Sequence, residues 1–75
     1  MEIAPRIIVD RNICHGAPVI MGTRVPISII VGSLAGMSMQ EVMCEYEITH
    51  EDIQAALAYA AEIVTKTELI ELAGT

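Results

Sequence analysis

The chain has few aromatic and few basic residues, and both shortages limit what it can be. It contains no tryptophan or phenylalanine and only two tyrosines, although 53% of its 75 residues are apolar. A hydrophobic core must therefore be built from aliphatic side chains, methionine and alanine. Lysine and arginine number four against ten aspartates and glutamates, which gives a net charge of −6. Because phosphate neutralisation supplies most non-specific affinity for nucleic acid, the overall charge does not favour binding to DNA or RNA.

Long apolar runs are also lacking. Charged residues such as Arg24 and Glu41 interrupt every candidate segment before it reaches membrane-spanning length. No basic segment followed by an apolar stretch marks a signal peptide. We therefore expect a soluble, cytoplasmic protein with no membrane partner.

Cysteine is scarce, since Cys14 and Cys44 are the only two. In a reducing cytosol we expect free thiols rather than a disulfide. With His15 and His50 they include the residue types of a zinc site, but an adjacent Cys-His pair followed by a gap of about thirty residues matches no usual structural zinc spacing. No catalytic dyad or phosphate-binding glycine loop is recognisable. We predict no metal, no cofactor and no enzymatic activity.

The size of the chain and its apolar content together predict self-association. A single domain of 8.1 kDa with a mean hydropathy of +0.54 cannot hide this much apolar surface by itself. A homodimer or larger assembly would bury the excess. Two surfaces could form the interface between the copies: the exposed edge of an N-terminal β-ribbon, and an alanine-rich third helix.

The densest backbone signals lie between Cys14 and Ser28. Gly16 and Gly22 can adopt positive φ, and two prolines fix φ and bias the residues before them toward extended conformations. Two three-residue segments, 19–21 and 23–25, each contain two β-branched residues and are long enough for a short strand.

A second apolar run, over residues 6–9, predicts a strand that pairs with part of 19–25. Two strands alone are marginal in water, so this ribbon must pack on helices or on a second chain. The expected organisation is one domain, residues 1–75, with a β-arm over about 5–25 and a helical bundle over about 26–73.

Three helices are predicted after the arm. The first begins at Pro26 and stops at Gly36. The second opens with a capping box from Ser38 to Glu41, and the third opens with a similar box from Thr49. The third helix can extend through residues 66–73 and stop at Gly74. The predicted buried faces comprise Met39, Val42, Met43 and Tyr46 on the second helix, and Ile53, Leu57, Ala60, Ala61 and Val64 on the third.

Four segments together resemble a known family: Ile7-Ile8-Val9-Asp10, the run from Cys14 to Ser28 with Gly22-Thr23-Arg24 at its centre, Gly36-Met37-Ser38, and Thr49-His50-Glu51-Asp52-Ile53. Over roughly residues 6–62 the chain resembles the small prokaryotic domain-of-unknown-function family 433. One departure is that His15 stands between Cys14 and Gly16, where the family more often reads Cys-Gly. The resemblance implies an antitoxin-like protein with a homeodomain-like helical bundle and a neighbouring PIN-like ribonuclease toxin.

The predicted fold class is α+β and mostly helical: a short β-ribbon followed by a three-helix, homeodomain-like bundle with a helix-turn-helix arrangement. The predicted function is that of an antitoxin-like interaction protein that neutralises a PIN-like ribonuclease toxin and can regulate its own operon. Two alternatives stay open, namely a DNA-binding transcriptional regulator without a toxin partner and a structural homo-oligomer. Acids cluster from Glu41 onward and favour a protein partner, whereas most of the basic residues lie in the first third and offer operator DNA a cationic face.

The candidate binding residues lie in the arm and on the third helix. Arg24 could contact a phosphate or a partner carboxylate, or it could hold the arm to an acid of the same chain. Gln54 could read adenine, although Glu51 and Asp52 at the helix tip repel phosphates. The predicted partner- or DNA-binding residues are Arg6, Arg11, Gly22, Thr23, Arg24 and Gln54.

Overall fold

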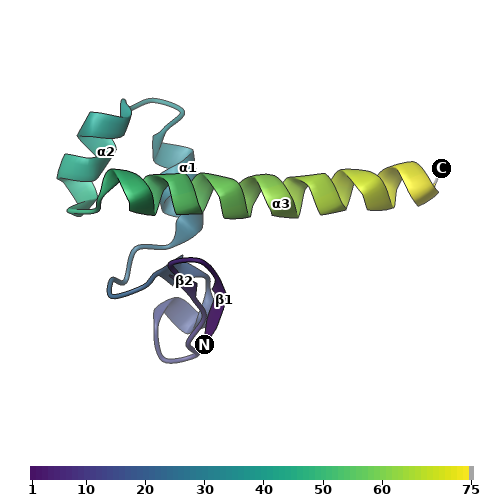
Figure 1. Ribbon diagram of the computed structural model, residues 1–75, viewed down its shortest axis with the longest axis horizontal. Coiled ribbons are helices and arrows are strands. Elements are labelled where there is room, and N and C mark those ends of the chain that lie inside the picture. Colours follow the sequence, from purple (N-terminus) through teal and green to yellow (C-terminus); the bar gives the residue numbers. More distant parts are fainter. Residues whose placement is uncertain (75) are drawn as a thin grey trace.

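The fold is a small three-stranded sheet followed by three helices (Figure 1). This computed structural model describes the backbone of residues 1–74 and the side chains of residues 1–67. The elements are β1 (Glu2–Ala4), β2 (Ile7–Ile8), β3 (Val19–Ile20), α1 (Ile27–Ser33), α2 (Met39–Tyr46) and α3 (His50–Gly74), with a 3₁₀ turn at Cys14–Gly16. The predicted α+β, mostly helical class is confirmed.

The sheet is antiparallel, with the strand order β1-β2-β3. Ile7 pairs with Ile20 in the two strands that the sequence predicts. The first strand is an addition to the expected two-stranded ribbon. The chain reverses between β1 and β2 at Arg6, which has a φ of 66° and donates its backbone N–H to the Glu2 carboxylate at 3.1 Å. A non-glycine residue with positive φ is uncommon, so the sequence carries no signal for this turn.

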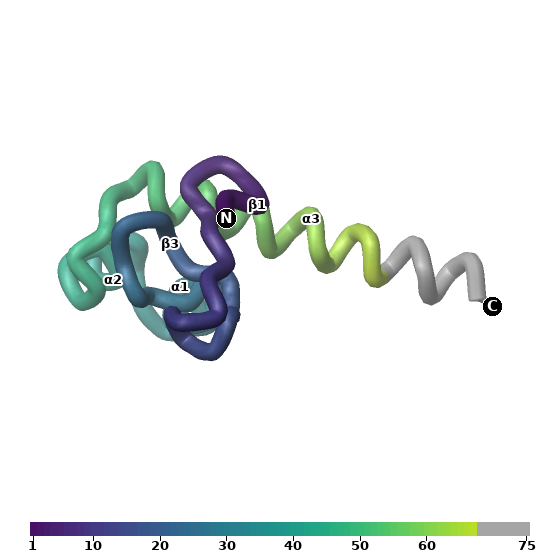
Figure 2. The backbone as a smooth tube through the Cα atoms, turned by 90° about the horizontal axis from the view of Figure 1, so that it is seen from below, coloured from purple at the N-terminus to yellow at the C-terminus, as the bar shows by residue number. Residues whose placement is uncertain are grey.

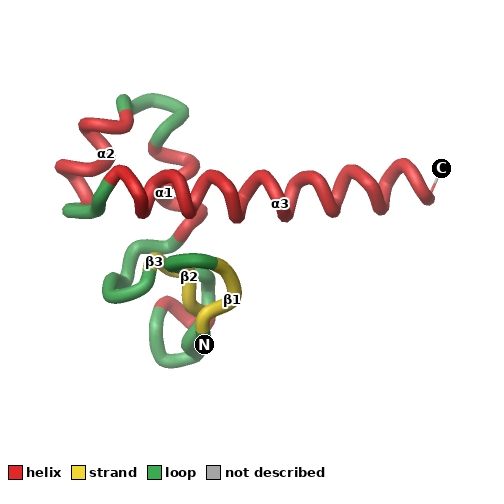
Figure 3. Tube along the Cα trace, viewed as in Figure 1, coloured by secondary structure: helices red, strands yellow, loops and turns green. Residues whose placement is uncertain are grey.

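The expected strand over residues 23–25 is instead a turn. The backbone N–H of Ile20 donates to the carbonyl of Val25 at 3.2 Å, and Val19 forms an isolated bridge with Pro26. The chain therefore doubles back directly onto β3 before α1 begins. Figure 3 shows how much of the arm is turn and loop rather than strand.

The two predicted capping boxes are confirmed. Ser38 Oγ accepts from the backbone N–H of Glu41 at 3.1 Å, and the Glu41 carboxylate accepts from the backbone N–H of Ser38 at 2.9 Å. Thr49 and Asp52 exchange the same two bonds at the start of α3, at 3.1 and 3.0 Å. Each box satisfies backbone donors that the first helical turn leaves free.

The end of α1 differs from the prediction. The helix begins after Pro26 as expected, but its last residue is Ser33, and residues 34–36 continue as turns. Gly36 is not among the glycines with positive φ, so it does not form a left-handed helix cap. The backbone N–H groups of Gly36 and Met37 both donate to the Ser33 carbonyl instead.

The core is aliphatic, as the lack of aromatic residues requires. It joins the sheet to all three helices through Ile7, Ile20, Ile27, Ile30, Val42, Ile48, Ile53 and Ala56. Tyr46 and Tyr59 pack at its border, and the Tyr46 hydroxyl shares a 2.9 Å hydrogen bond with Ser33.

The predicted buried face of α3 is wrong at Leu57, Ala61 and Val64, whereas Ala60 is half-buried. Leu57 and Val64 are 39% and 54% exposed, and Ala61 is also exposed. Ala56, the residue before Leu57, is fully buried instead. The helix is therefore rotated about its axis, relative to the prediction, by roughly the angle between two consecutive residues. The cause lies at the helix start, where the buried Asp52 is held toward the body by its contacts. The later part of α3 projects beyond the rest of the molecule (Figures 1 and 2).

Candidate partner-binding site

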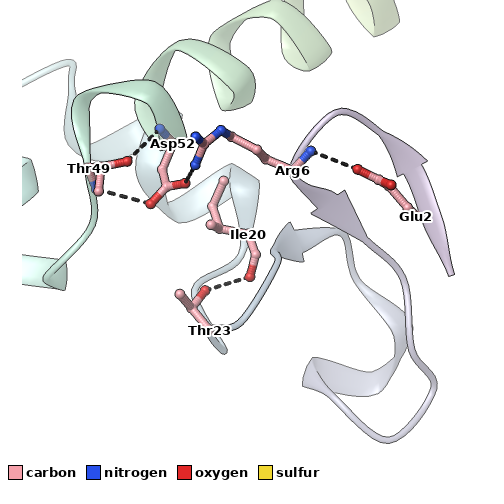
Figure 4. A network of polar contacts seen from close by, with 6 residues as sticks. All are labelled: Glu2, Arg6, Ile20, Thr23, Thr49 and Asp52. Carbon is pink, nitrogen blue, oxygen red and sulfur yellow. Dashed lines mark hydrogen bonds and ion pairs between the residues drawn. The ribbon is translucent and has the colours of Figure 1, made fainter.

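The Gly22-Thr23-Arg24 segment forms a tight turn after β3. Gly22 has a φ of 83°, and the backbone N–H of Thr23 donates to the carbonyl of Ile20 at 3.0 Å. The Thr23 hydroxyl donates to the same carbonyl at 2.8 Å (Figure 4). It also accepts from the backbone N–H of Val25 at 3.1 Å. Two of the predicted binding residues, Gly22 and Thr23, thus shape the backbone of this turn.

Arg24 presents an exposed side chain at this turn. Its carbonyl accepts a contact from Cys14 Sγ at 3.2 Å, which ties the turn to the preceding 3₁₀ turn. Within residues 1–67, the guanidinium group of Arg24 has no hydrogen bond or ion pair. It is therefore available to a partner, and the intramolecular anchor considered for it is made by another arginine.

Arg6 makes that anchor. Its Nη1 atom donates to Asp52 Oδ1 at 3.0 Å, while the other carboxylate oxygen of Asp52 accepts from the backbone N–H of Thr49 (Figure 4). One carboxylate thus caps α3 and holds the arm against it. The Arg6 side chain is about half exposed and that of Asp52 is nearly buried. Sequence reasoning missed this contact because the partners stand 46 positions apart.

The loop between β2 and β3 contains a left-handed turn. Cys14, His15 and Gly16 have φ values of 49°, 57° and 85°, although only the last is a glycine. Residues held in such conformations cost about 1–3 kcal/mol each and persist only where surrounding contacts fix them. Here the backbone N–H of Ile13 donates to the carbonyl of Asp10, and that of Ala17 donates to the carbonyl of Cys14.

This loop carries the exposed side chains of Arg11 and His15. The backbone of Arg11 passes close to Gly16, since a Cβ atom added there would lie 3.8 Å from Arg11 Cα. Because Cys14 also contacts the Arg24 carbonyl, the segments that carry Arg11, His15 and Arg24 are joined. The arm therefore presents cationic side chains from two linked turns.

The opposite charge gathers on α2 and the start of α3. We define the acidic face as Glu41, Glu45, Glu47 and Glu51, which are all exposed. Within residues 1–67 none of them forms an ion pair. The backbone N–H and the hydroxyl of Ser38 hydrogen-bond Glu41 and hold the pKa of its carboxyl below the ordinary value of 4.5. These contacts therefore stabilise the charged form of the Glu41 carboxyl.

Gln54 lies on the exposed side of α3, one turn after the helix start. Glu51 precedes it by three positions and therefore shares its helix surface. No lysine or arginine occurs in the helix before Lys66. The structure thus places Gln54 with the acids rather than with the arginines of the arm.

Metal-binding groups do not gather in the described part of the chain. Among these residues, no three histidine, cysteine, aspartate or glutamate side chains lie close enough to hold one ion. Cys14 is partly buried and Cys44 is exposed, and both are free thiols. None of the helices, over the residues described, is both long and apolar enough to cross a membrane.

An apolar groove of about 570 Å³ lies beside α1 and α3. Three separate segments line it: Ala17, Pro18, Ile27, Ser28, Val31, Gly32, Tyr59, Ala60, Ile63 and Val64. None of these residues is charged, and only Ser28 and Tyr59 carry a polar side-chain atom. Sequence reasoning did not find the groove, because its walls come together only in the folded chain.

Comparison with known proteins gives one match. A family model described as protein of unknown function, DUF433, matches residues 7–60. No curated protein and no solved structure matches the chain. The matched segment includes β2, β3, α1, α2 and the first part of α3. Because it spans more than half of the chain and includes the Gly22-Thr23-Arg24 turn, the protein belongs to the DUF433 family.

Proposed function

We propose that the protein is an antitoxin-like interaction module whose acidic face binds a basic surface of a PIN-like ribonuclease toxin. The observation that carries the proposal is the acidic face itself, whose glutamates are exposed and have no ion-pair partner within residues 1–67. Ribonucleases bind an anionic substrate, so their binding grooves are cationic and attract acidic side chains. The toxin class follows from the resemblance to antitoxin-like proteins.

A second candidate function is binding to operator DNA through the arm. The exposed side chains of Arg11 and Arg24 favour it, because phosphate contacts need free cationic groups. Reading of DNA by α3 is disfavoured, since Glu51 beside Gln54 would repel phosphates. This function is compatible with toxin binding, because the two would use different surfaces.

The test of the acidic face is an affinity measurement on single charge-neutral variants. The partner to be used is the product of the adjacent reading frame, which the proposal requires to be PIN-like, co-expressed and purified with the full chain. Glu45→Gln and Glu51→Gln should each weaken the complex about three- to tenfold, or about 0.7–1.4 kcal/mol, with a smaller effect at high salt.

The matched control is Glu62→Gln, which removes the same charge from α3 outside the acidic face. Glu62 forms an exposed ion pair with Lys66 at 3.1 Å, so its charge is already balanced. Affinity for the toxin should stay within twofold of the wild type. If all three variants bind alike, the acidic face does not hold the toxin.

A further inference from the structure

The body-facing side of α3 continues past the end of the body. Ile53 and Ala56 are buried, Ala60 is half-buried and Ile63 is 44% exposed. These residues follow one another at spacings of three and four, so they lie on one face of the helix. The face that packs on α1 thus continues along the groove, where Ile63 stays partly exposed within the described residues.

The projecting part of α3 is long for a helix without support. Beyond Val64, the last residue that lines the groove, the helix continues to Gly74 for about ten residues, roughly 15 Å at 1.5 Å per residue. Isolated helices of this length are marginal in water, and helices in proteins gain most of their stability by packing an apolar face. A packing partner for the Ala60–Ile63 face is therefore needed.

We propose that the groove beside α1 and α3 is a homodimer seam, in which α3 of a second copy packs antiparallel along the Ala60–Ile63 face. In this arrangement the projecting helix of each copy covers the groove of the other. The proposal concerns a different surface from the acidic face, so it stands whether or not a toxin binds there.

A second copy suits this groove because one patch carries both complementary shapes. Ile63 and Val64 protrude from α3, while the small residues Ala17, Ser28 and Gly32 lie in the wall opposite. A two-fold interface brings the same patch of two molecules together, so each must offer protrusion and recess at once. The groove and the projecting helix meet that requirement.

The net charge of the chain also favours a second copy as the occupant of the groove. Two copies that each carry a net charge of −6 repel one another unless they meet where acids are absent. The groove lining has no charged side chain, and beside it Glu62 and Lys66 neutralise each other. A basic toxin, in contrast, gains nothing electrostatically from this surface and would be drawn to the acidic face.

The other conceivable seam, the edge of the sheet, is poorly built for pairing. One edge strand, β1, has only three residues, and its register is irregular between Glu2 and Ala4. The other edge strand, β3, has two residues and already bonds to Val25 and Pro26 of the same chain. Short and irregular edges are devices that prevent strands from pairing between molecules. The helical seam is therefore the stronger of the two.

The test is the mass of the full chain in solution, measured by light scattering at micromolar concentration. We expect twice the 8.1 kDa of one chain for the wild type, and a monomer for Ile63→Glu. Ile29→Glu is the matched control, because Ile29 is 46% exposed on α1 and does not line the groove. It should remain dimeric.

Val64→Glu repeats the test at a second groove position that is 54% exposed, so the proposal does not depend on the folding of one variant. Circular dichroism should show both glutamate variants folded, and amide exchange over residues 60–67 should become at least tenfold faster in them. A monomeric wild type would overturn the proposal. So would a dimer that survives both groove variants or that Ile29→Glu disrupts.

Contact between the two α3 helices has a separate readout in cross-linking. In a Cys44→Ala background, which removes the exposed thiol, Val64→Cys should give a disulfide-linked dimer under mild oxidation. Ile29→Cys in the same background should stay uncross-linked. Equal cross-linking at both positions would contradict this arrangement of the helices.

Discussion

At the scale of single residues, Gly22 and Thr23 shape the backbone of the Gly22-Thr23-Arg24 turn, and Arg24 presents an exposed side chain there. The sequence predicted that Gly22 would permit a positive φ, and it does. It did not predict the two bonds of the Thr23 hydroxyl, because they depend on where Ile20 and Val25 lie in the folded turn. Arg24 is left as the exposed member of the motif, and its role as a binding residue stays a prediction.

The conformational demand at Gly22 can be measured by substitution with alanine. A Cβ atom at this position would meet nothing within 4 Å, so the cost comes from the φ of 83° alone. Gly22→Ala should lower the free energy of unfolding by about 1–2 kcal/mol in denaturant titration. Gly36→Ala is the control, since that site is equally open and is not left-handed, and it should be neutral or slightly stabilising. Equal effects at both glycines would refute the role assigned to Gly22.

Alanine substitutions of Arg24 and Arg6 should distinguish a residue available for binding from one that stabilises the fold. Arg24→Ala should change the free energy of unfolding by less than about 0.5 kcal/mol, because the side chain is exposed and unpaired within residues 1–67. Arg6→Ala should cost about 1 kcal/mol through loss of the contact with Asp52. Thermal unfolding of both variants compares the two losses of stability. If Arg24→Ala is the more destabilising change, the assignment of Arg6 as the anchor is wrong.

At the scale of elements, local signals predicted helix starts well and helix faces less well. The boxes at Ser38 and Thr49 were recognisable because all their atoms come from four consecutive residues. The orientation of α3 was not recognisable from the sequence, since it depends on the contact between Asp52 and the distant Arg6. The strand β1 was missed for a similar reason, because its turn relies on a positive φ at Arg6 rather than on a glycine.

The capping box of α2 predicts a pH dependence. The pKa of Glu41 is lower in the folded chain than its ordinary value of 4.5, because the Ser38 backbone N–H and hydroxyl bond the charged carboxylate. The stability it adds is therefore fully present above the unfolded pKa and is lost as the pH falls through the folded value. Glu41→Gln keeps a bonding group but cannot titrate. The melting temperature of the wild type should exceed that of the variant at pH 7, and the gap should shrink below pH 4.5. A gap that stays constant down to pH 3 would contradict this.

At the scale of the whole molecule, the acidic face lies on α2 and the start of α3, whereas the groove lies between the arm, α1 and the later part of α3. Composition alone predicted an aliphatic core and surplus apolar surface, and the structure places part of that surplus, Ile63 and Val64, along the groove on α3. The groove itself could not be predicted, since Pro18, Gly32 and Ile63 become neighbours only through tertiary packing. The acidic face was foreseeable because its residues are close in sequence.

The link between the arm and the helices should appear as coupling in a double-mutant cycle. Arg6→Ala, Asp52→Asn and the double variant should give a coupling energy of about 0.5–1 kcal/mol, which is modest because the Arg6 side chain is half exposed. The more exposed pair Glu62 and Lys66 provides the comparison and should give less than about 0.5 kcal/mol. A coupling near zero for the first pair would show that the arm is held by apolar contacts alone.

The most direct test of the proposed function uses the product of the adjacent reading frame, which the proposal requires to be a PIN-like ribonuclease. Its ribonuclease activity is measured while purified full-length protein is titrated in. The account predicts that activity falls to background once the protein is in slight molar excess. It also predicts that a Glu45→Lys, Glu51→Lys variant, which reverses charge on the acidic face, inhibits at least tenfold less well while keeping its melting temperature within a few degrees. Full ribonuclease activity in the presence of a large excess of the wild-type protein would contradict the account.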